Sequence, residues 1–152
     1  LTYLNKINYE LHLAGPLSNI NRSKLKKLLN NKNVIYHGIL DKKSLCEVMY
    51  NSDIFVFPSY AEGSARVIFE AMASGCAVIT TENSGSVVKN FKNGIIIKPN
   101  DPKSISNSIK FFYKNKDNIS KYGKKNKLLI RKKYTQKRYG GELIKIYNKI
   151  KL

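Results

Sequence analysis

The chain has 152 residues, 42% of them hydrophobic, which suffices for one domain with a buried core and not for two domains of ordinary size. Lys and Arg number 28 against 10 Asp and Glu, a formal net charge of +18, so the partners to consider are anionic: phosphorylated ligands, anionic membranes or nucleic acid. No apolar run approaches the roughly 18 residues that a membrane-spanning helix needs, which argues against an integral membrane protein.

Apolar patterns with strand and helix periods alternate along the chain. Strands are expected at 9–13, 34–36, 54–57, 77–80 and 94–97, and helices at 17–30, after the N-cap Asp41, at 65–74, at 101–113 and in a basic segment at about 115–152. Strands separated by helical patterns of about ten to fifteen residues indicate repeated βαβ units. The predicted fold class is therefore α/β, a Rossmann-like parallel sheet with helices on both faces. Ligands of such sheets bind outside the carboxyl ends of the strands.

The most informative segment is 57–78, FPSYAEGSARVIFEAMASGCAV. An apolar strand leads into a Gly-Ser-Ala turn that opens a helix, with Ser64 as the candidate N-cap and Gly75 placed to end the helix. The first amides of a helix have no intrahelical partner and the helix dipole is positive there, so a phosphate fits. Glu62 and Glu70 flank the turn, and carboxylates accept hydrogen bonds from hydroxyl groups. Phosphate and hydroxyls together point to a nucleotide sugar.

The stretch PSYAEGSARVIFEAMASGCAVITT closely resembles the core signature of the retaining family-4 glycosyltransferases (glycosyl transferases group 1), which have the GT-B fold. Glu62 and Glu70 occupy the two acidic positions of that family's Glu-x7-Glu motif. The resemblance implies that Glu62 is catalytic and lies against the donor sugar, and that Glu70 holds the ribose. It also implies that backbone amides around Ser64 to Val67 face the sugar and diphosphate. The candidate donor-binding residues are thus Gly63, Ser64, Ala65, Arg66, Val67 and Glu70.

Several of these residues have a plainer reading. Glu62 and Glu70 by themselves would pass for ordinary surface carboxylates, and only the surrounding motif favours function. Arg66 either places its guanidinium against phosphate or is solvated. Gly63 suits a turn where the backbone approaches a ligand. His37 is expected to be a core histidine, like His12, with a place in the wall of the nucleotide pocket as the alternative.

Two stretches depart from the family pattern. After the strand at 77–80, family members commonly carry a Gly-Gly turn followed by an acid, whereas this chain has Ser84-Gly85-Ser86 and no acid there. The usual Phe-Gly after Glu-Gly is Ser64-Ala65. Both differences point to selection of a different sugar. Neither argues against nucleotide-sugar binding.

The resemblance further implies that the chain is the donor-binding, C-terminal half of a GT-B enzyme. Residues 1–152 are expected to form a single nucleotide-sugar-binding domain that is truncated at its N-terminus, starts inside a helix and lacks the domain's first strand. The family's basic pair near that strand has no counterpart here. An N-terminal acceptor-binding domain is the missing partner, and the isolated chain is expected to be inactive.

The function expected from the resemblance is retaining transfer of a hexose from a nucleoside-diphosphate sugar, in synthesis of a cell-surface polysaccharide or glycolipid. The leaving diphosphate serves as its own base, so neither a cofactor nor a metal is expected. The alternatives are a non-catalytic nucleotide-binding module and a basic nucleic-acid-binding domain. The sequence shows no RNA-binding or recognition-helix pattern that would support the nucleic-acid-binding alternative, so no nucleic acid is expected as a partner.

Charge and cysteine usage bear on location. The basic run at 121–138 suits an anionic membrane surface, although the Lys residues are scattered and compositional bias also explains the charge. Cys46 and Cys76 have no second Cys or His at metal-ligand spacing, and both are expected to be reduced, buried thiols. The expected location is the cytoplasm, with a peripheral place at the inner membrane surface as an option.

Overall fold

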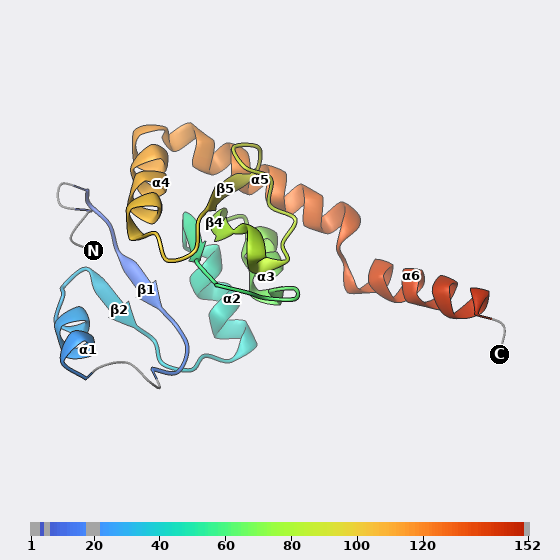
Figure 1. Ribbon diagram of the computed structural model, residues 1–152, viewed down its shortest axis with the longest axis horizontal. Coiled ribbons are helices and arrows are strands. Elements are labelled where there is room, and N and C mark those ends of the chain that lie inside the picture. Colours follow the sequence, from blue (N-terminus) through green and yellow to red (C-terminus); the bar gives the residue numbers. More distant parts are fainter. Residues whose placement is uncertain (1–3, 5–6, 18–21, 151–152) are drawn as a thin grey trace.

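The computed structural model describes Leu4, residues 7–17 and residues 22–150 (Figure 1). The strands are β1 (Leu11–Leu13), β2 (Val34–Tyr36), β3 (Ile54–Phe57), β4 (Ala77–Thr81) and β5 (Gly94–Ile97). The helices are α1 (Arg22–Leu29), α2 (Lys42–Tyr50), α3 (Arg66–Ser74), α4 (Pro102–Lys114), α5 (Lys116–Lys133) and α6 (Gln136–Lys149). A 3-10 turn, Glu82–Ser84, follows β4. The predicted order of elements is confirmed.

Most element boundaries agree with the sequence patterns. β2, β3 and β5 begin and end as predicted, β4 extends one residue further, to Thr81, and β1 is shorter than the predicted strand at 9–13. Asp41 caps α2: its carboxylate accepts a hydrogen bond from the Ser44 backbone N–H at 2.7 Å, and this bond lowers the pKa of Asp41. Part of the predicted helix at 17–30, and the predicted start of the chain inside a helix, lie outside the described residues.

The strands form two parallel sheets rather than the single sheet predicted. β3, β4 and β5 pair in that order, with Phe57 opposite Thr80 and Thr80 opposite Ile96. β1 pairs with β2, and Leu11 lies opposite Val34. Within the described residues, β1 and β3 each keep one edge without a strand partner. A doubly wound sheet of order 3-2-1-4-5-6 has its first strand between these two edges, so the sheet divides where no described strand joins them. That the domain's first strand is missing stays a prediction.

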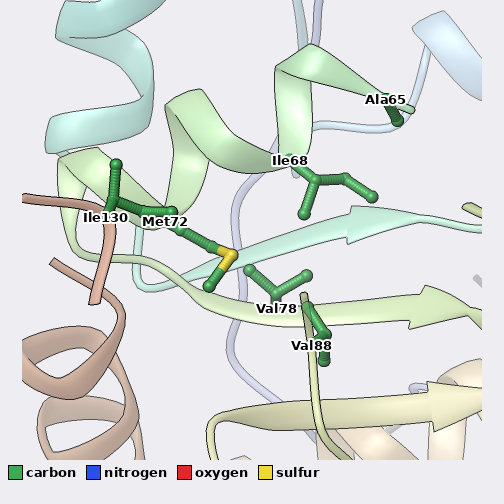
Figure 2. Close-up of a cluster of buried hydrophobic side chains, with 6 residues drawn as sticks. All are labelled: Ala65, Ile68, Met72, Val78, Val88 and Ile130. Carbon is green, nitrogen blue, oxygen red and sulfur yellow. The ribbon is translucent and has the colours of Figure 1, made fainter. Parts of the chain in front are cut away.

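Two apolar clusters cover opposite faces of the sheet formed by β3, β4 and β5. On one face Val78 packs with side chains of α3 that include Met72, which points toward the sheet (Figure 2). On the other face Ile79 packs with Phe112 of α4 and Tyr122 of α5. Because successive residues of a strand point to opposite faces, Val78 and Ile79 enter different clusters. The prediction of helices on both faces is confirmed for this sheet.

Helix α5 lies close to the end of α3 and the start of β4. The buried side chain of Asn126 donates a hydrogen bond to the carbonyl oxygen of Cys76 at 2.9 Å. A Cβ at Gly123 would overlap the carbonyl oxygen of Gly75, so the two helices approach as closely as only glycine allows. Gly75 has a φ of 99° and ends α3 in the predicted left-handed conformation.

Helix α6 contributes no buried residue and extends away from the rest of the molecule (Figure 1). Its side chains that are more than half exposed include the apolar or aromatic residues Tyr139, Ile144, Ile146 and Tyr147. The predicted basic segment at about 115–152 therefore forms two helices, α5 packed on the domain and α6 projecting from it.

The two cysteines differ in exposure, which predicts different reactivity. Cys76 is buried, its thiol donates to the Met49 carbonyl oxygen at 3.1 Å, and burial raises its pKa to about 11. Cys46 is only half-buried, so the expectation of two buried thiols is wrong for Cys46. Since the thiolate is the reactive form, iodoacetamide at about pH 8 is expected to modify Cys46 well before Cys76.

Mass spectrometry of the two cysteine-containing peptides measures both rates. In the urea-unfolded chain, which serves as the control, the two thiols should react at similar rates. Similar rates in the folded chain would contradict the burial of Cys76.

Candidate functional site

The segment singled out in the sequence lies where β3 and β4 end. Residues 58–65 join β3 to α3, and Glu82–Ser84 follows β4. Because β3 and β4 run parallel, both segments leave the sheet at its carboxyl edge, where such sheets bind ligands. The Thr81 hydroxyl, at the end of β4, donates to the Ser59 carbonyl oxygen at 2.6 Å and fastens the loop near its start.

Most predicted site residues lie together on this loop and on the first turn of α3. The exposed ones are Glu62, Gly63, Ser64 and Arg66. Ala65 and Val67 instead pack their side chains into the hydrophobic core beneath α3. Ala65 is buried and Val67 is half-buried, so their side chains serve packing.

Helix α3 begins one residue later than predicted, and Ser64 is not its N-cap. The cap residue is Ala65, whose side chain makes no hydrogen bond. The prediction fails because the backbone of Ala65 is extended, with a φ of −73° and a ψ of 92°, and its N–H donates to the Ser84 carbonyl oxygen at 3.2 Å. This bond occupies the Ala65 amide in the unliganded chain, and the role of that amide in donor binding stays a prediction.

Other backbone amides at the start of α3 remain open. Those of Gly63, Ser64, Arg66 and Val67 donate no hydrogen bond to the part of the chain that the structure describes. The positive end of the helix dipole lies at the same place. The exposed Arg66 guanidinium belongs to the first residue of the helix. This arrangement can bind a phosphate group.

Glu70 lies away from the loop, on the second turn of α3. It is half-buried and lines an open depression of about 510 Å³ together with Glu47 and Tyr50 of α2 and Lys127 of α5, among others. Glu62 does not line this depression. The structure therefore does not bring the two predicted carboxylates into one cavity.

Asn83 contacts the loop that carries Glu62, although no sequence pattern singled it out. Its carbonyl oxygen accepts a hydrogen bond from the Glu62 N–H at 2.8 Å, and its side-chain amide donates to the Tyr60 carbonyl oxygen at 3.0 Å. An Asn-Ser-Gly run is a turn signal. Nothing local in the sequence indicates which loop such a turn contacts.

The two histidines form a second polar cluster, on β1 and just after β2. His12 Nδ1 lies 2.8 Å from His37 Nε2, and His12 Nε2 lies 2.7 Å from Glu10 Oε1. Both histidines are half-buried, so the expectation of core histidines holds only in part. The place of His37 in a nucleotide pocket stays a prediction.

The described residues hold neither a metal-binding cluster nor a membrane span. Within 7–17 and 22–150, no three His, Cys, Asp or Glu side chains gather into a group that can hold a metal ion. None of the described helices is both long and apolar enough to cross a bilayer. That no metal takes part in the chemistry stays a prediction.

Comparison with known proteins identifies relatives over most of the chain. The family model described as glycosyl transferases group 1 matches residues 1–129. The capsular polysaccharide biosynthesis glycosyltransferase CapM of Staphylococcus aureus is 28% identical over 146 residues, which cover 93% of this chain and 38% of CapM. The chain spans about a third of the length of the curated relatives it matches.

Solved structures share the fold. The C-terminal domain of LpcC, a glycosyl transferase group 1 family protein from Francisella tularensis, is 26% identical with a TM-score of 0.67, over 75% of this chain and 60% of that one. HepE from Anabaena, solved in complex with UDP-glucose, is 16% identical with a TM-score of 0.79, over 93% of this chain and 41% of HepE. The fold is that of the C-terminal half of GT-B glycosyltransferases, as the resemblance implied. The chain belongs to the family of glycosyl transferases group 1.

Proposed function

We propose that this chain binds the donor in a retaining glycosyltransferase that transfers a hexose from a nucleoside-diphosphate sugar. The observation that carries the proposal is the group of open amides at Gly63, Ser64, Arg66 and Val67, which lies beside Glu62 at the carboxyl edge of the sheet. The structure of HepE with UDP-glucose and the family match of the chain support it. CapM, named for capsular polysaccharide biosynthesis, supports a product at the cell surface, a polysaccharide or a glycolipid.

The open amides and the dipole of α3 suit the diphosphate of the donor. As the bond to the sugar breaks, negative charge grows on this diphosphate, and donors already in place stabilise it without reorganising. The Arg66 guanidinium can add a bidentate contact. In this proposal the leaving diphosphate acts as its own base, so the reaction needs neither a separate protein base nor a metal.

The two carboxylates have separate roles in the proposal. Glu62 is exposed on the loop and lies against the donor sugar. Glu70 is half-buried on the second turn of α3 and holds the ribose hydroxyls. In this proposal the donor contacts Glu62 through its sugar and Glu70 through its ribose.

Replacing Glu70 by glutamine is expected to weaken the binding of UDP to this chain about tenfold or more. A carboxylate that accepts hydrogen bonds from ribose makes charge-assisted contacts worth about 1.5 to 3 kcal/mol, and the amide loses the charge while keeping the shape. Isothermal titration calorimetry of both proteins with UDP measures the effect.

The matched control is Glu47→Gln. Glu47 lines the same depression from α2, and this substitution removes the same charge. Its affinity for UDP should equal that of the unchanged chain. An unchanged affinity in Glu70→Gln, or an equal loss in both variants, would remove Glu70 from the nucleotide site.

A salt series in the same titration tests the alternative of a nucleic-acid-binding domain. Binding to a phosphate backbone releases counterions and therefore falls steeply with salt concentration. A nucleotide held by a few amides and a carboxylate should show a shallow dependence. Tight, strongly salt-dependent binding of an oligonucleotide with no binding of UDP would overturn the proposal. Binding of UDP without transfer by any protein that carries the chain would favour the non-catalytic module.

We further propose that the acceptor is bound outside this chain, by an N-terminal domain, and that the chain by itself does not transfer sugar. The length of the relatives supports this, since the chain spans about a third of them. The basic end of α5, with Arg131, Lys132 and Lys133, supports a peripheral contact with an anionic membrane, where the acceptor of a cell-surface polymer would be met.

A further inference from the structure

The loop 58–65 has little to hold it in one shape from within. In the described part of the chain, the one internal hydrogen bond that it shows is from the Ser59 hydroxyl to the Ala61 carbonyl oxygen, a long one at 3.4 Å. Glu62, Gly63 and Ser64 are all exposed, so no side-chain packing fixes them. A loop of this kind explores many conformations unless something outside it selects one.

The neighbouring turn after β4 supplies the missing contacts. The Asn83 carbonyl oxygen accepts from the Glu62 N–H at 2.8 Å, and the Asn83 side-chain amide donates to the Tyr60 carbonyl oxygen at 3.0 Å. One residue further on, the Ser84 carbonyl oxygen accepts from the Ala65 N–H at 3.2 Å. Asn83 thus holds the backbone on both sides of Ala61 and reaches Glu62 directly.

Gly85 closes the contact by steric fit. A Cβ at this position would overlap the Gly63 carbonyl oxygen, and Gly85 has a φ of 60°, in the left-handed region. Any other residue would be strained there and would also push the loop away. The backbone of the turn therefore lies directly against the backbone of the loop 58–65, which is called the donor loop below.

The turn is itself well fixed. Ser84 is fully buried, its hydroxyl donates to the Thr81 carbonyl oxygen at 2.8 Å, and it lies 3.1 Å from the Ser86 hydroxyl. Thr81 is the last residue of β4, the central strand of its sheet. Through Ser84, the turn that contacts the loop is thus anchored to β4, all of whose residues are buried.

We propose that the Glu82–Gly85 turn sets the shape of the donor loop before any ligand arrives, and that Asn83 is the positioning residue for Glu62. Asn83 acts through the Glu62 backbone and the Tyr60 carbonyl group, without touching the donor. A carboxylate already in place spares the reaction the cost of ordering it, which is the basis of preorganised catalysis. This inference rests on the proposed function for the role of Glu62, whereas the contact between turn and loop is independent of it.

Hydrogen exchange on the unliganded 152-residue chain tests the contact alone. The amides of Glu62 and Ala65 are expected to exchange at least about tenfold more slowly than those of Gly63 and Ser64, although the loop is exposed. NMR resolves the four amides individually. Exchange of Glu62 as fast as that of Gly63 would overturn the proposal, whether or not the chain binds UDP. If the protection is present and UDP does not bind, the proposed function fails and the contact stands.

Kinetics of a transferase that carries this chain test the positioning role. Asn83→Ala removes the side-chain amide that donates a hydrogen bond to the Tyr60 carbonyl oxygen. Because one hydrogen bond that orders the loop is lost, kcat is expected to fall about three- to tenfold, with little change in the KM of the sugar nucleotide. Asn83→Asp keeps the shape but has no amide donor, so its kcat should fall at least as far. A wild-type kcat in either variant would overturn the positioning role.

Gly85→Ala tests the steric contact with the same two measurements. Its added Cβ is expected to move the loop, abolish the slow exchange of Glu62 and lower kcat more than either Asn83 variant does. The matched control is Gly140→Ala on α6, where a Cβ meets no atom within 4 Å. If Gly85→Ala does not fold, as judged by circular dichroism, the two Asn83 variants decide. A folded Gly85→Ala with slow Glu62 exchange and full kcat would contradict the proposal.

Discussion

Replacing Glu62 by alanine in a transferase that carries this chain is expected to lower kcat by about two to three orders of magnitude, with the affinity for free nucleotide nearly unchanged. The sugar ring changes charge as its bond to the diphosphate breaks, so a carboxylate against the ring acts mainly in the transition state. Contacts that strengthen only there appear in kcat, and uniform binding appears in KM. Glu62 suits this role because its side chain is exposed while its N–H is bound to Asn83 at 2.8 Å.

Steady-state kinetics with the donor varied, together with calorimetry of free UDP, separate the two carboxylates. Glu70→Ala should mainly raise the KM of the donor, since the nucleotide is gripped equally before and during transfer. Glu47→Ala, on the exposed face of α2, serves as a control for loss of a carboxylate elsewhere. If Glu62→Ala changed KM and Glu70→Ala changed kcat, the two roles would be assigned to the wrong residues.

Replacing Phe112 by alanine is expected to destabilise the chain by about 3 to 5 kcal/mol. Phe112 has no exposed surface and packs from α4 onto the face of the sheet that holds Ala77 and Ile79. Its ring meets that of Tyr122 edge to face at 5.7 Å between centroids, which joins α4 to α5. The substitution leaves a cavity and removes this contact. Against a typical stability of about 5 to 15 kcal/mol, the loss leaves the domain marginal or unfolded.

Urea denaturation followed by circular dichroism measures the change in the free energy of unfolding. The adjacent Tyr113 is 42% exposed, so Tyr113→Ala is the matched control and should cost far less. Equal effects of the two substitutions, or a loss below about 1 kcal/mol for Phe112→Ala, would contradict the position of Phe112 at the centre of the core.

The strands and helices could be predicted from the sequence because their signals are local. The apolar run Ile54–Phe57 and the run Gly94–Ile97 have the length and composition of buried parallel strands, and both lie where predicted. Asp41 and Gly75 act on the helix that each adjoins, so the capping rules located them as well. The fold class follows from the alternation of these elements.

The division into two sheets could not be predicted in this way. The sequence pattern of a strand is the same whether that strand has a partner on one edge or on both edges. The partners are distant in the sequence, so the pattern does not identify them. β1 and β3 keep open edges in the described residues, and no pattern within Leu11–Leu13 or Ile54–Phe57 distinguishes them from strands with two partners.

For the candidate site, the sequence by itself determined the motif: Glu62 and Glu70, the Gly63 turn between them and the helix that follows. The tertiary structure decided which groups of that motif are free to act. The Ala65 amide is taken by Ser84, Ala65 and not Ser64 caps α3, and Glu70 lies in a depression that Glu62 does not line. It also decided that Asn83 and Gly85 shape the loop. The physical reason is that hydrogen bonds and steric contacts between two loops depend on how the parallel strands place the ends from which the loops start. The residues of one loop do not indicate which other loop lies beside it.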